Sequence, residues 1–486
     1  MLLPVVGASN SPVNVPATAP SKKASSALSE ESIVIGFCKI NLQKNDKTLS
    51  FLDSKNVFYP IFEQIPNYTN LLVLSTEKIS LQSPSVPIDA EIQLTSSKSE
   101  SNRALVIQAL ADEEIVLHNL SEARDTQTMQ RLLQSSEPEW DVLDAGTTMR
   151  FLIAYSSAHR MGKVLKGTPR MHQRPVRLLV DALRTLGADI QYLDQEGYPP
   201  VLVRGFTNGQ IASRVSIQGD VSSQYISALL MIGPTLEDGI ELTLTGKIGS
   251  RPYIKMTLGL MERFGVTHEW KDDNAIHIDP QPYREGEYTI ESDWSGASYW
   301  YSVVALADEA RVKLLGLRQD SLQGDSAIVD IMDQLGVHTQ FEDNGVVLTK
   351  KEGASTFTYD FSDCPDLAQT VAVVCAARGV SATLTGLESL RIKETDRIAA
   401  LQSELSKIGA TLEESDNVGK IIPPAEGDLT SAATFATYED HRMAMAFAPL
   451  ALKMNVTIEN PKVVNKSYPR YWDDLAKAGI TYSPVG

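Results

Sequence analysis

An amphipathic helical pattern that stops at a glycine and continues as a short β-like run recurs four times along this chain. The stopping glycines are spaced 78, 71 and 73 residues apart, at Gly187, Gly265, Gly336 and Gly409. Glycine after the last helical turn is the expected C-cap, because it adopts the left-handed conformation without steric cost. Such stops are common in α/β proteins, but four near-equal spacings indicate a repeated unit of several strands and helices. Residues 76–486 would hold about six such units, three in each of two domains.

The composition fits a globular α/β protein without a membrane span. The chain has 486 residues, of which 43% are apolar and 22% charged, so more than one core is expected. No apolar run approaches the roughly 18 residues that a membrane span needs. Cys38, Cys364 and Cys375 form no CxxC pair, and the seven histidines show no HExxH spacing. We therefore expect no disulfide framework and no protein-held metal, and a reducing, cytoplasmic compartment.

The net charge of −17 argues against nucleic acid or an anionic membrane as the main partner, because proteins that bind these carry a basic face. An acidic protein that binds small anions must gather cations locally.

The N-terminal part of the chain is expected to lie outside the catalytic unit. Residues 1–29 contain no Asp or Glu and four prolines, which predicts disorder. A plastid transit peptide is an alternative interpretation, weakened because the first arginine is Arg103. Between residues 30 and 75, the stretches "ESIVIGFCKI" and "NLLVLS" are possible strands without evident chemistry.

Several segments lead from small polar residues into an apolar helix, among them "TSSKSESNRAL", "DAGTTMRFL" and "GDVSSQY". Ser, Thr or Asp in such places often caps the helix and stabilises it by roughly 1 kcal/mol. A helix N-terminus also binds anions, because its free N–H groups and macrodipole favour negative charge. The segments carry more cations than capping requires: Lys98, Arg103, Arg150, Arg174, Lys393, Arg397, Arg442 and Lys466. Carboxylates or phosphates are the expected ligands; without GxxxxGK(S/T), a P-loop nucleotide site is not expected.

Two carboxylates are candidates for proton transfer. Asp366 opens a very apolar helix, whose terminus favours the ionised form. Glu394 lies between Lys393 and Arg397 in "RIKETDR", where a surface ion pair of little energy is the alternative. If both face a water-poor cleft, they can act as general base and acid. His441 in "EDHRM" is interpreted as a capping or packed histidine in preference to a catalytic one.

Nine motifs, in order from about Ile79 to the C-terminus, carry a resemblance to a known family. They are "SKSESNRAL", "DAGTTMRFL", "GTPRMHQRPV", "GDVSSQY", "SRPYIKMT", "CPDLA", "LRIKETDR", "DHRMAMAF" and "NKSYPRYW". The chain resembles the 5-enolpyruvylshikimate-3-phosphate (EPSP) synthase family, the 3-phosphoshikimate 1-carboxyvinyltransferases.

The resemblance implies a fold of two inverted α/β domains, each of three βαβαββ-type repeats, with the substrates in the cleft between them. Residues 1–75 would then be an N-terminal extension. Residues 96–290 would form the domain that carries most of the shikimate 3-phosphate site. Residues 76–95 with 291–486 would form a discontinuous domain that carries the acid/base residues and much of the phosphoenolpyruvate site.

The reaction that the resemblance implies transfers the enolpyruvyl group of phosphoenolpyruvate to the 5-hydroxyl of shikimate 3-phosphate and releases phosphate. It is an addition followed by an elimination, belongs to the shikimate pathway of aromatic amino acid biosynthesis and needs no cofactor. Both substrates are anions. The expected partners are these substrates alone, without nucleic acid or membrane, and the expected oligomeric state is a monomer.

The family's site residues transfer to matching positions of this chain. The positions expected to bind phosphoenolpyruvate are Lys98, Gly146, Arg174, Gln224, Arg397, Arg442 and Lys466. The positions expected to bind shikimate 3-phosphate are Lys98, Ser99, Arg103, Ser222, Ser223, Gln224, Ser250, Tyr253, Asp366 and Lys393. Asp366 matches the proton acceptor for the 5-hydroxyl, and Glu394 and Lys98 complete the catalytic set.

The chain departs from the family pattern near the expected site, where "TSSKS" replaces the usual "PGSKS" and three single positions also differ. Asp144 stands where the family often has Asn, Phe151 where it often has Pro, and Ser389 where it often has Asn. Two alternative functions remain open: a sister enolpyruvyl transferase acting on UDP-N-acetylglucosamine, and a non-catalytic anion-binding protein on the same scaffold. The "RIKETDR" and "SSQY" motifs favour the shikimate enzyme over the first, and Asp366 with Glu394 favours an enzyme over the second.

Overall fold

The computed structural model describes seven segments of the chain. They are residues 32–35, 38–41, 50–52, 58–60, 78–219, 222–425 and 429–485. The chain divides into two compact units, Met1–Tyr68 and Thr69–Gly486.

The first unit contains a four-stranded antiparallel sheet in the order β1-β2-β3-β4. Its strands are β1 (Ser32–Ile35), β2 (Cys38–Asn41), β3 (Ser50–Leu52) and β4 (Phe58–Pro60). The first two strands agree with the expectation for "ESIVIGFCKI". The predictions made for residues 1–29 and for "NLLVLS" lie outside the described residues.

The second unit repeats one arrangement, in which two strands joined through a helix pair in parallel and the next strands return antiparallel. Four of its sheets follow the order βαβαββ. The first is β8 (Glu139–Asp141), α4 (Gly146–Ala158), β9 (Lys163–Lys166), α5 (Arg177–Leu186), β10 (Asp189–Tyr192) and β11 (Val201–Gly205). The second is β12 (Arg214–Gln218), α6 (Ser223–Ile232), β13 (Ile240–Thr245), α7 (Arg251–Arg263), β14 (Glu269–Trp270) and β15 (Ala275–Ile278).

The same order returns twice in the C-terminal half. The third sheet is β6 (Ile88–Gln93), α8 (Trp294–Leu306), β17 (Ala310–Leu315), α9 (Ile328–Gln334), β18 (Val337–Glu342) and β19 (Gly345–Lys350). The fourth is β20 (Thr356–Asp360), α10 (Ala368–Ala377), β21 (Ser381–Thr385), α11 (Arg397–Ser406), β22 (Thr411–Ser415) and β23 (Val418–Ile422). In the third sheet, 200 residues of sequence separate the end of β6 from the start of α8. This repeat is therefore interrupted by a long insertion.

Two further sheets depart from the simple repeat. One pairs β7 (Ile115–His118) with β16 (Gly286–Thr289) in parallel, next to α2 (Lys98–Leu110) and α3 (Arg124–Leu133). The other takes β5 (Lys78–Gln82) into a sheet with β24 (Ala432–Phe435), α12 (His441–Phe447), β25 (Asn455–Glu459), α13 (Tyr471–Lys477) and β26 (Thr481–Pro484). Strands far apart in sequence therefore complete these two sheets.

The glycine stops predicted from the repeat are confirmed. Gly187, Gly265, Gly336 and Gly409 have φ values of 115°, 81°, 90° and 80°. Only glycine enters this region readily, because a Cβ would meet the neighbouring carbonyl. Each glycine lies between a helix and the strand that follows: α5 and β10, α7 and β14, α9 and β18, α11 and β22.

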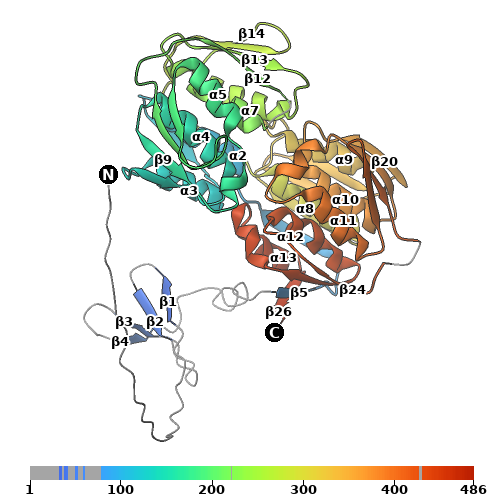
Figure 1. Ribbon diagram of the computed structural model, residues 1–486. Helices are drawn as coiled ribbons and strands as arrows, with labels where there is room; N and C mark the ends of the chain where they lie inside the picture. Colours follow the sequence, from blue (N-terminus) through green and yellow to red (C-terminus); the bar gives the residue numbers. More distant parts are fainter. Residues whose placement is uncertain are drawn as a thin grey trace, which may run out of the picture. The chain divides into compact units, whose positions relative to one another are not determined.

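Buried apolar side chains of the second unit form two separate cores. One core draws on residues between 104 and 290, and the other on residues 79–94 and 294–480. Figure 1 shows α2, α4, α5 and α7 grouped in one lobe and α8 to α13 in another. The domain boundaries expected from the sequence stay a prediction, which this division of the cores supports.

The chain passes between the two cores twice, and the two passages touch. Ser96 and Ser292 form an isolated antiparallel bridge. The Ser97 amide donates to the Glu291 carbonyl and the Asp293 amide to the Thr95 carbonyl, both at 2.8 Å. These paired passages lead directly into α2 and α8.

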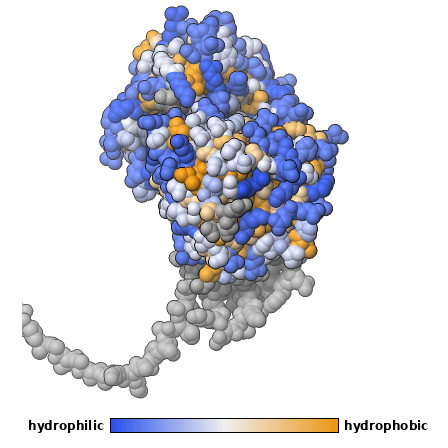
Figure 2. All heavy atoms as spheres, turned by 90° about the vertical axis from the view of Figure 1, so that its right-hand side faces the viewer, coloured by the Kyte–Doolittle hydropathy of each residue, from blue (hydrophilic) through white to orange (hydrophobic). Residues whose placement is uncertain are grey.

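Figure 2 shows one face, on which hydrophilic residues predominate around smaller apolar areas. No described helix is both long enough and apolar enough to cross a membrane.

Candidate active site

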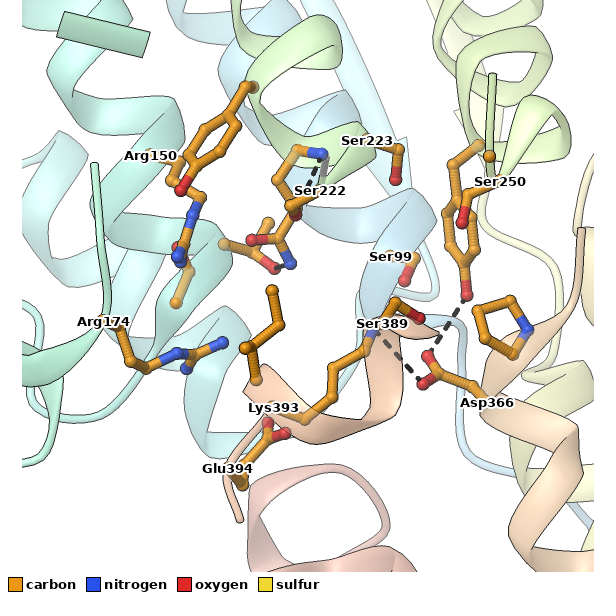
Figure 3. A pocket seen from close by; sticks show the side chains of 18 of the residues that line it. Ser99, Arg150, Arg174, Ser222, Ser223, Ser250, Asp366, Ser389, Lys393 and Glu394 are labelled. Atoms are coloured by element: carbon orange, nitrogen blue, oxygen red, sulfur yellow. Dashed lines mark hydrogen bonds and ion pairs between the residues drawn. The ribbon is translucent and has the colours of Figure 1, made fainter. Parts of the chain in front are cut away.

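A pocket of about 510 Å³ lies between the two cores of the second unit. Its lining includes every predicted site residue except Lys466, which is considered below. Figure 3 shows serines 99, 222, 223 and 250 with Arg150 and Arg174 around the upper part, and Asp366, Lys393 and Glu394 below them. Motifs separated by hundreds of residues thus meet at one place. We call the side that belongs to the 104–290 core, together with helix α2, the first wall, and the opposite side the second wall.

Helix α2 brings its N-terminal turn to the first wall. Ser97 caps the helix and accepts a hydrogen bond from the Glu100 amide. Lys98, in the first turn, forms an ion pair with Asp125 at 3.1 Å. The Lys98 ammonium is therefore already balanced by a carboxylate from α3 while it lines the pocket.

Arg103 is buried and largely committed to the protein. Its Nε donates to the Thr257 hydroxyl at 2.8 Å, and its two terminal nitrogens donate to the Ser99 carbonyl and the Ser227 hydroxyl. Its guanidinium also lies 5.4 Å from the Phe151 ring centroid. Phe151 thus packs under Arg103, and this departure from the family pattern is accommodated in the core.

Helix α4 starts at Gly146, where the backbone leaves room for an arginine. A Cβ built on Gly146 would come within 2.6 Å of the Arg174 guanidinium. Arg150 is turned inward and donates to the carbonyls of Gly146 and Pro175, at 2.8 and 3.2 Å. Arg174 therefore lies against the N-terminus of α4, while Arg150 holds the surrounding backbone.

Helix α6 presents a polar N-terminus to the same pocket. Ser222 caps the helix and accepts from the Gln224 amide. The Gln224 side chain donates to the Thr147 hydroxyl at 2.8 Å, and its Oε1 is buried without a partner. Free N–H groups at this end suit an anionic group.

The second wall is an interlocked set of carboxylates and cations centred on Asp366. This residue lies in a 3₁₀ turn, Pro365–Leu367, directly before α10. It accepts from Arg397 at 2.8 Å and from Arg442 at 3.0 Å, with Lys393 at 3.7 Å. Burial alone would raise the pKa of Asp366, but these three cations outweigh it and hold the pKa well below its usual range.

Arg397 links three carboxylates and is 2% exposed. Its guanidinium contacts Asp440 at 2.7 Å, Asp366 at 2.8 Å and Glu394 at 3.1 Å. Asp396, just before it, caps α11 by accepting from two backbone amides. The charged "RIKETDR" stretch is thus a helix start and a pocket wall at once.

Glu394 is ionised for a similar reason. Burial raises its pKa, whereas Lys466, Arg397 and Arg174 together hold the pKa well below its usual range. His441 is buried at the start of α12 and lines the pocket, and burial together with Lys98 and Arg442 lowers its pKa far below the usual range. The His441 imidazole is therefore neutral, as expected for a packed histidine, and it adds no positive charge to the pocket.

Lys466 does not line the pocket. It lies in the predicted motif "NKSYPRYW", but its side chain is 4% exposed and its ammonium forms ion pairs with Asp144 at 3.1 Å and Glu394 at 3.3 Å. Ser389 does line the pocket, and its hydroxyl is buried without a partner. The position where the family often has Asn thus still offers a polar group.

Sequence reasoning missed several carboxylates that support the pocket. Asp440 is fully buried, caps α12 and binds Arg397. Asp325 accepts a hydrogen bond from Ser295, whose hydroxyl in turn accepts from Arg442 at 3.3 Å. Burial raises the pKa of Asp325 to about 6. The cap position of Asp440 in "EDHRM" was a readable signal, whereas nothing in the sequence near Asp325 points to Arg442.

Among the described residues, no group of three or more His, Cys, Asp or Glu side chains is placed to hold a metal ion. What the pocket offers is a set of cations for anionic ligands and two ionised carboxylates that can accept protons.

Comparison with solved structures defines the class of fold. An EPSP synthase from Acinetobacter baumannii superposes with a TM-score of 0.70 at 20% identity, covering 84% of this chain and 99% of that one. The enolpyruvyl transferase NikO from Streptomyces tendae superposes with a TM-score of 0.65 at 14% identity, covering 84% and 98%. The fold is therefore the two-domain α/β fold of these proteins, and the predicted fold class is confirmed.

Sequence comparison identifies the family. Residues 82–139 and 134–475 match the family described as EPSP synthase (3-phosphoshikimate 1-carboxyvinyltransferase). A 3-phosphoshikimate 1-carboxyvinyltransferase from Bacteroides fragilis (strain YCH46) is 49% identical over 403 residues, 82% of this chain and 97% of the relative. One from Cronobacter sakazakii is 37% identical over 431 residues, 82% and 98%. The chain belongs to the EPSP synthase family, so its activity is 3-phosphoshikimate 1-carboxyvinyl transfer.

Proposed function

We propose that the pocket binds shikimate 3-phosphate and phosphoenolpyruvate together and transfers the enolpyruvyl group between them. The observation that carries this proposal is the meeting of cations from both cores around Asp366 and Glu394 in one pocket. Both substrates are anionic, and charge-assisted hydrogen bonds to phosphate and carboxylate groups are strong. An acidic protein needs such a local concentration of cations to bind them.

Shikimate 3-phosphate occupies the part of the pocket that is rich in hydroxyls. The N-terminus of α6 with Ser222 and Ser223 receives the phosphate, because free amides and hydroxyls there can donate to it. Lys393 and Asp366 hold the ring hydroxyls from the second wall. The remaining contacts of this subsite are assigned to Lys98, Ser99, Arg103, Gln224, Ser250 and Tyr253, all of which line the pocket.

Phosphoenolpyruvate occupies the part next to α4 and α11. Arg174 lies against Gly146 there, and Arg397 and Arg442 approach from the second wall. Planar guanidinium groups suit carboxylate and phosphate oxygens, because each can donate two parallel hydrogen bonds. Gln224, Lys98 and Lys466 complete this subsite, although Lys466 must turn from its present partners to reach the donor.

Asp366 removes the proton from the 5-hydroxyl of shikimate 3-phosphate. Its carboxyl is ionised, and the bound donor shares Arg397 and Arg442 with it. Each anionic group that engages these arginines weakens their hold on Asp366 and so raises its basicity. The 5-oxygen attacks carbon 2 of phosphoenolpyruvate while carbon 3 gains a proton from Glu394 or Lys98.

The tetrahedral intermediate then loses phosphate, which takes up the proton that Asp366 removed from the 5-hydroxyl and so regenerates the base. The proton gained at carbon 3 returns to the protein as the new double bond forms, so Glu394 or Lys98 acts first as acid and then as base. Atoms and charge balance without a redox step, and the scheme uses no cofactor. For Glu394 to act as acid it must first gain a proton, which donor binding to Lys466 and Arg174 favours by reducing their pull on its pKa.

In this proposal the enzyme is a monomer and acts in the cytoplasm. Its two domains are formed by residues 96–290 and by residues 76–95 together with 291–486. The curated relatives named above are bacterial and lend no support to the plastid alternative.

The test is phosphate release by the purified full-length chain with both substrates and with each omitted in turn. Release that requires both substrates is expected. A parallel reaction with UDP-N-acetylglucosamine as acceptor examines the sister activity. Release with that acceptor but not with shikimate 3-phosphate would contradict the proposal, and so would binding of both substrates without any release.

A further inference from the structure

Lys466 is a cation of the proposed donor subsite that is withdrawn from the pocket. Its ammonium donates to the Asp144 carboxylate at 3.1 Å and lies 3.4 Å from the Asp144 carbonyl oxygen. Glu394 Oε1 is 3.3 Å away. An ammonium has three donors, and Asp144 accepts from two of them, while Glu394 is an ion-pair partner. A donor anion that engages Lys466 therefore competes with these two carboxylates.

Asp144 lies on the loop between β8 and α4, two residues before Gly146. Arg124 donates to both of its carboxylate oxygens, at 2.8 and 2.9 Å. The Asp144 carbonyl accepts a hydrogen bond from Arg174 at 3.5 Å. Asp144 therefore contacts two of the cations assigned to phosphoenolpyruvate, Lys466 and Arg174, and it does so from outside the pocket lining.

The Asp144 carboxyl is ionised at neutral pH. Burial raises its pKa, but Lys466 and Arg124 outweigh burial and keep the pKa below its ordinary value. The side chain is 29% exposed while that of Lys466 is 4% exposed. The ion pair is thus shielded from solvent on the lysine side, where an attraction is less screened than at a surface.

We propose that Asp144 sets the affinity for phosphoenolpyruvate, because its carboxylate competes with the anionic donor for Lys466. The inference rests on the proposed function of the pocket. An asparagine, the residue that the family resemblance leads us to expect here, can also accept a hydrogen bond from Lys466 but carries no charge. The aspartate therefore makes the donor subsite less positive without removing a cation from it.

Competition explains the geometry better than a bracing role does. Without the Asp144 charge, Lys466 keeps Glu394 and the Asp144 carbonyl as partners, so its position does not depend on the carboxylate. Arg124, on the far side, is exposed and can be solvated. What the carboxylate adds is negative charge beside an anion-binding subsite.

The test is Asp144→Asn in the full-length chain. We expect KM for phosphoenolpyruvate to fall about tenfold, since one unit of opposing charge is removed next to a partly buried cation. KM for shikimate 3-phosphate should change less than about twofold, because its subsite does not include Lys466. Glu122→Gln is the matched control. It also removes one negative charge from an ion pair between the two cores, Glu122 with Arg470 at 3.6 Å, but Glu122 does not line the pocket.

A second pair of variants tests whether the effect passes through Lys466. In a Lys466→Met background, Asp144→Asn should leave KM for phosphoenolpyruvate unchanged, as a double-mutant cycle requires for a direct interaction. Binding without turnover provides a further readout: phosphoenolpyruvate should raise the thermal unfolding midpoint more in Asp144→Asn than in the wild type.

An unchanged or higher KM for phosphoenolpyruvate in Asp144→Asn overturns the inference, and so does an equal decrease in Glu122→Gln. A higher KM with a lower kcat would instead identify Asp144 as a brace between the cores. These outcomes are distinct from failure of the proposed function, which would appear as a wild-type chain that releases no phosphate from the two substrates.

Discussion

The two walls of the pocket balance their charges in different ways. On the first wall, Arg103 and Arg150 are held by hydroxyls and backbone carbonyls. On the second wall, Arg397 and Arg442 are held by carboxylates, chiefly Asp366 and Asp440. The first wall therefore keeps net positive charge for an anionic substrate. The second wall keeps carboxylates ionised beside the cations that will meet the donor.

Two buried carboxyls show what this difference does to proton affinity. Burial raises the pKa of Glu100, on α2, to about 7, and the hydrogen bonds from Tyr288 and the Glu291 amide, together with the charge of Arg318, offset this only in part. Asp366 is similarly desolvated, yet its pKa is held well below the usual range by three cations. The cations around Asp366, and not a lower degree of burial, thus keep this carboxyl ionised.

The largest expected effect is that of Asp366→Asn. The amide keeps the size of the side chain and can still hydrogen-bond the acceptor hydroxyl, but it cannot take its proton. Turnover should fall by about 10²–10⁴-fold, while the affinity for shikimate 3-phosphate changes much less. Steady-state kinetics and a binding titration measure the two quantities. Near-normal turnover would assign the base to Glu394 or Lys98.

Removing a cation should be costlier on the second wall than on the first. Arg397→Met leaves the buried carboxylates of Asp440, Asp366 and Glu394 without their shared partner, so the free energy of unfolding should fall by about 3–5 kcal/mol. Arg174→Met on the first wall should cost about 1 kcal/mol or less, because Arg174 donates only a long hydrogen bond, to the Asp144 carbonyl at 3.5 Å, within the described part of the chain. Urea unfolding of both variants tests the contrast, and equal losses would refute it.

The raised pKa of Glu100 predicts a pH effect of definite sign. A carboxyl whose pKa rises on folding stabilises the protein fully below its unfolded pKa, about 4.3, and this contribution is lost as the pH rises through about 7. Glu100→Gln mimics the protonated form. Between pH 5 and 8 the wild type should therefore lose about 2–3 kcal/mol more stability than the variant.

Urea unfolding at several pH values measures this difference, with the exposed Glu122→Gln as the control that should follow the wild type. Parallel curves for wild type and Glu100→Gln would mean that Glu100 titrates normally.

The smallest expected effect is that of Gly146→Ala. The added Cβ would lie 2.6 Å from the Arg174 guanidinium, which is the far end of a flexible side chain and can move aside. KM for phosphoenolpyruvate should rise by about 3–10-fold through displacement of a charge-assisted hydrogen bond, with little change in stability. Kinetics with the donor varied measures this. An unchanged KM would remove Arg174 from the donor subsite.

The sequence by itself determined the repeat and most of the pocket. A glycine such as Gly336 can be read as a helix stop, because its backbone requirement is local. The motifs around Lys98, Ser222, Asp366 and Arg397 could be placed at helix starts for the same reason. The meeting of these helix starts at one site was implied by the resemblance to the EPSP synthase family and not by the motifs themselves.

Only the tertiary structure decided how the charges are shared. Nothing in the sequence shows that Asp144 binds Lys466, that Asp440 binds Arg397, or that Ser295 joins Arg442 to Asp325. The Asp144 and Asp440 ion pairs join segments 322 and 43 residues apart. Ion pairs of this kind depend on distances of a few ångströms between elements from separate repeats, because Coulomb attraction and desolvation both change steeply over that range.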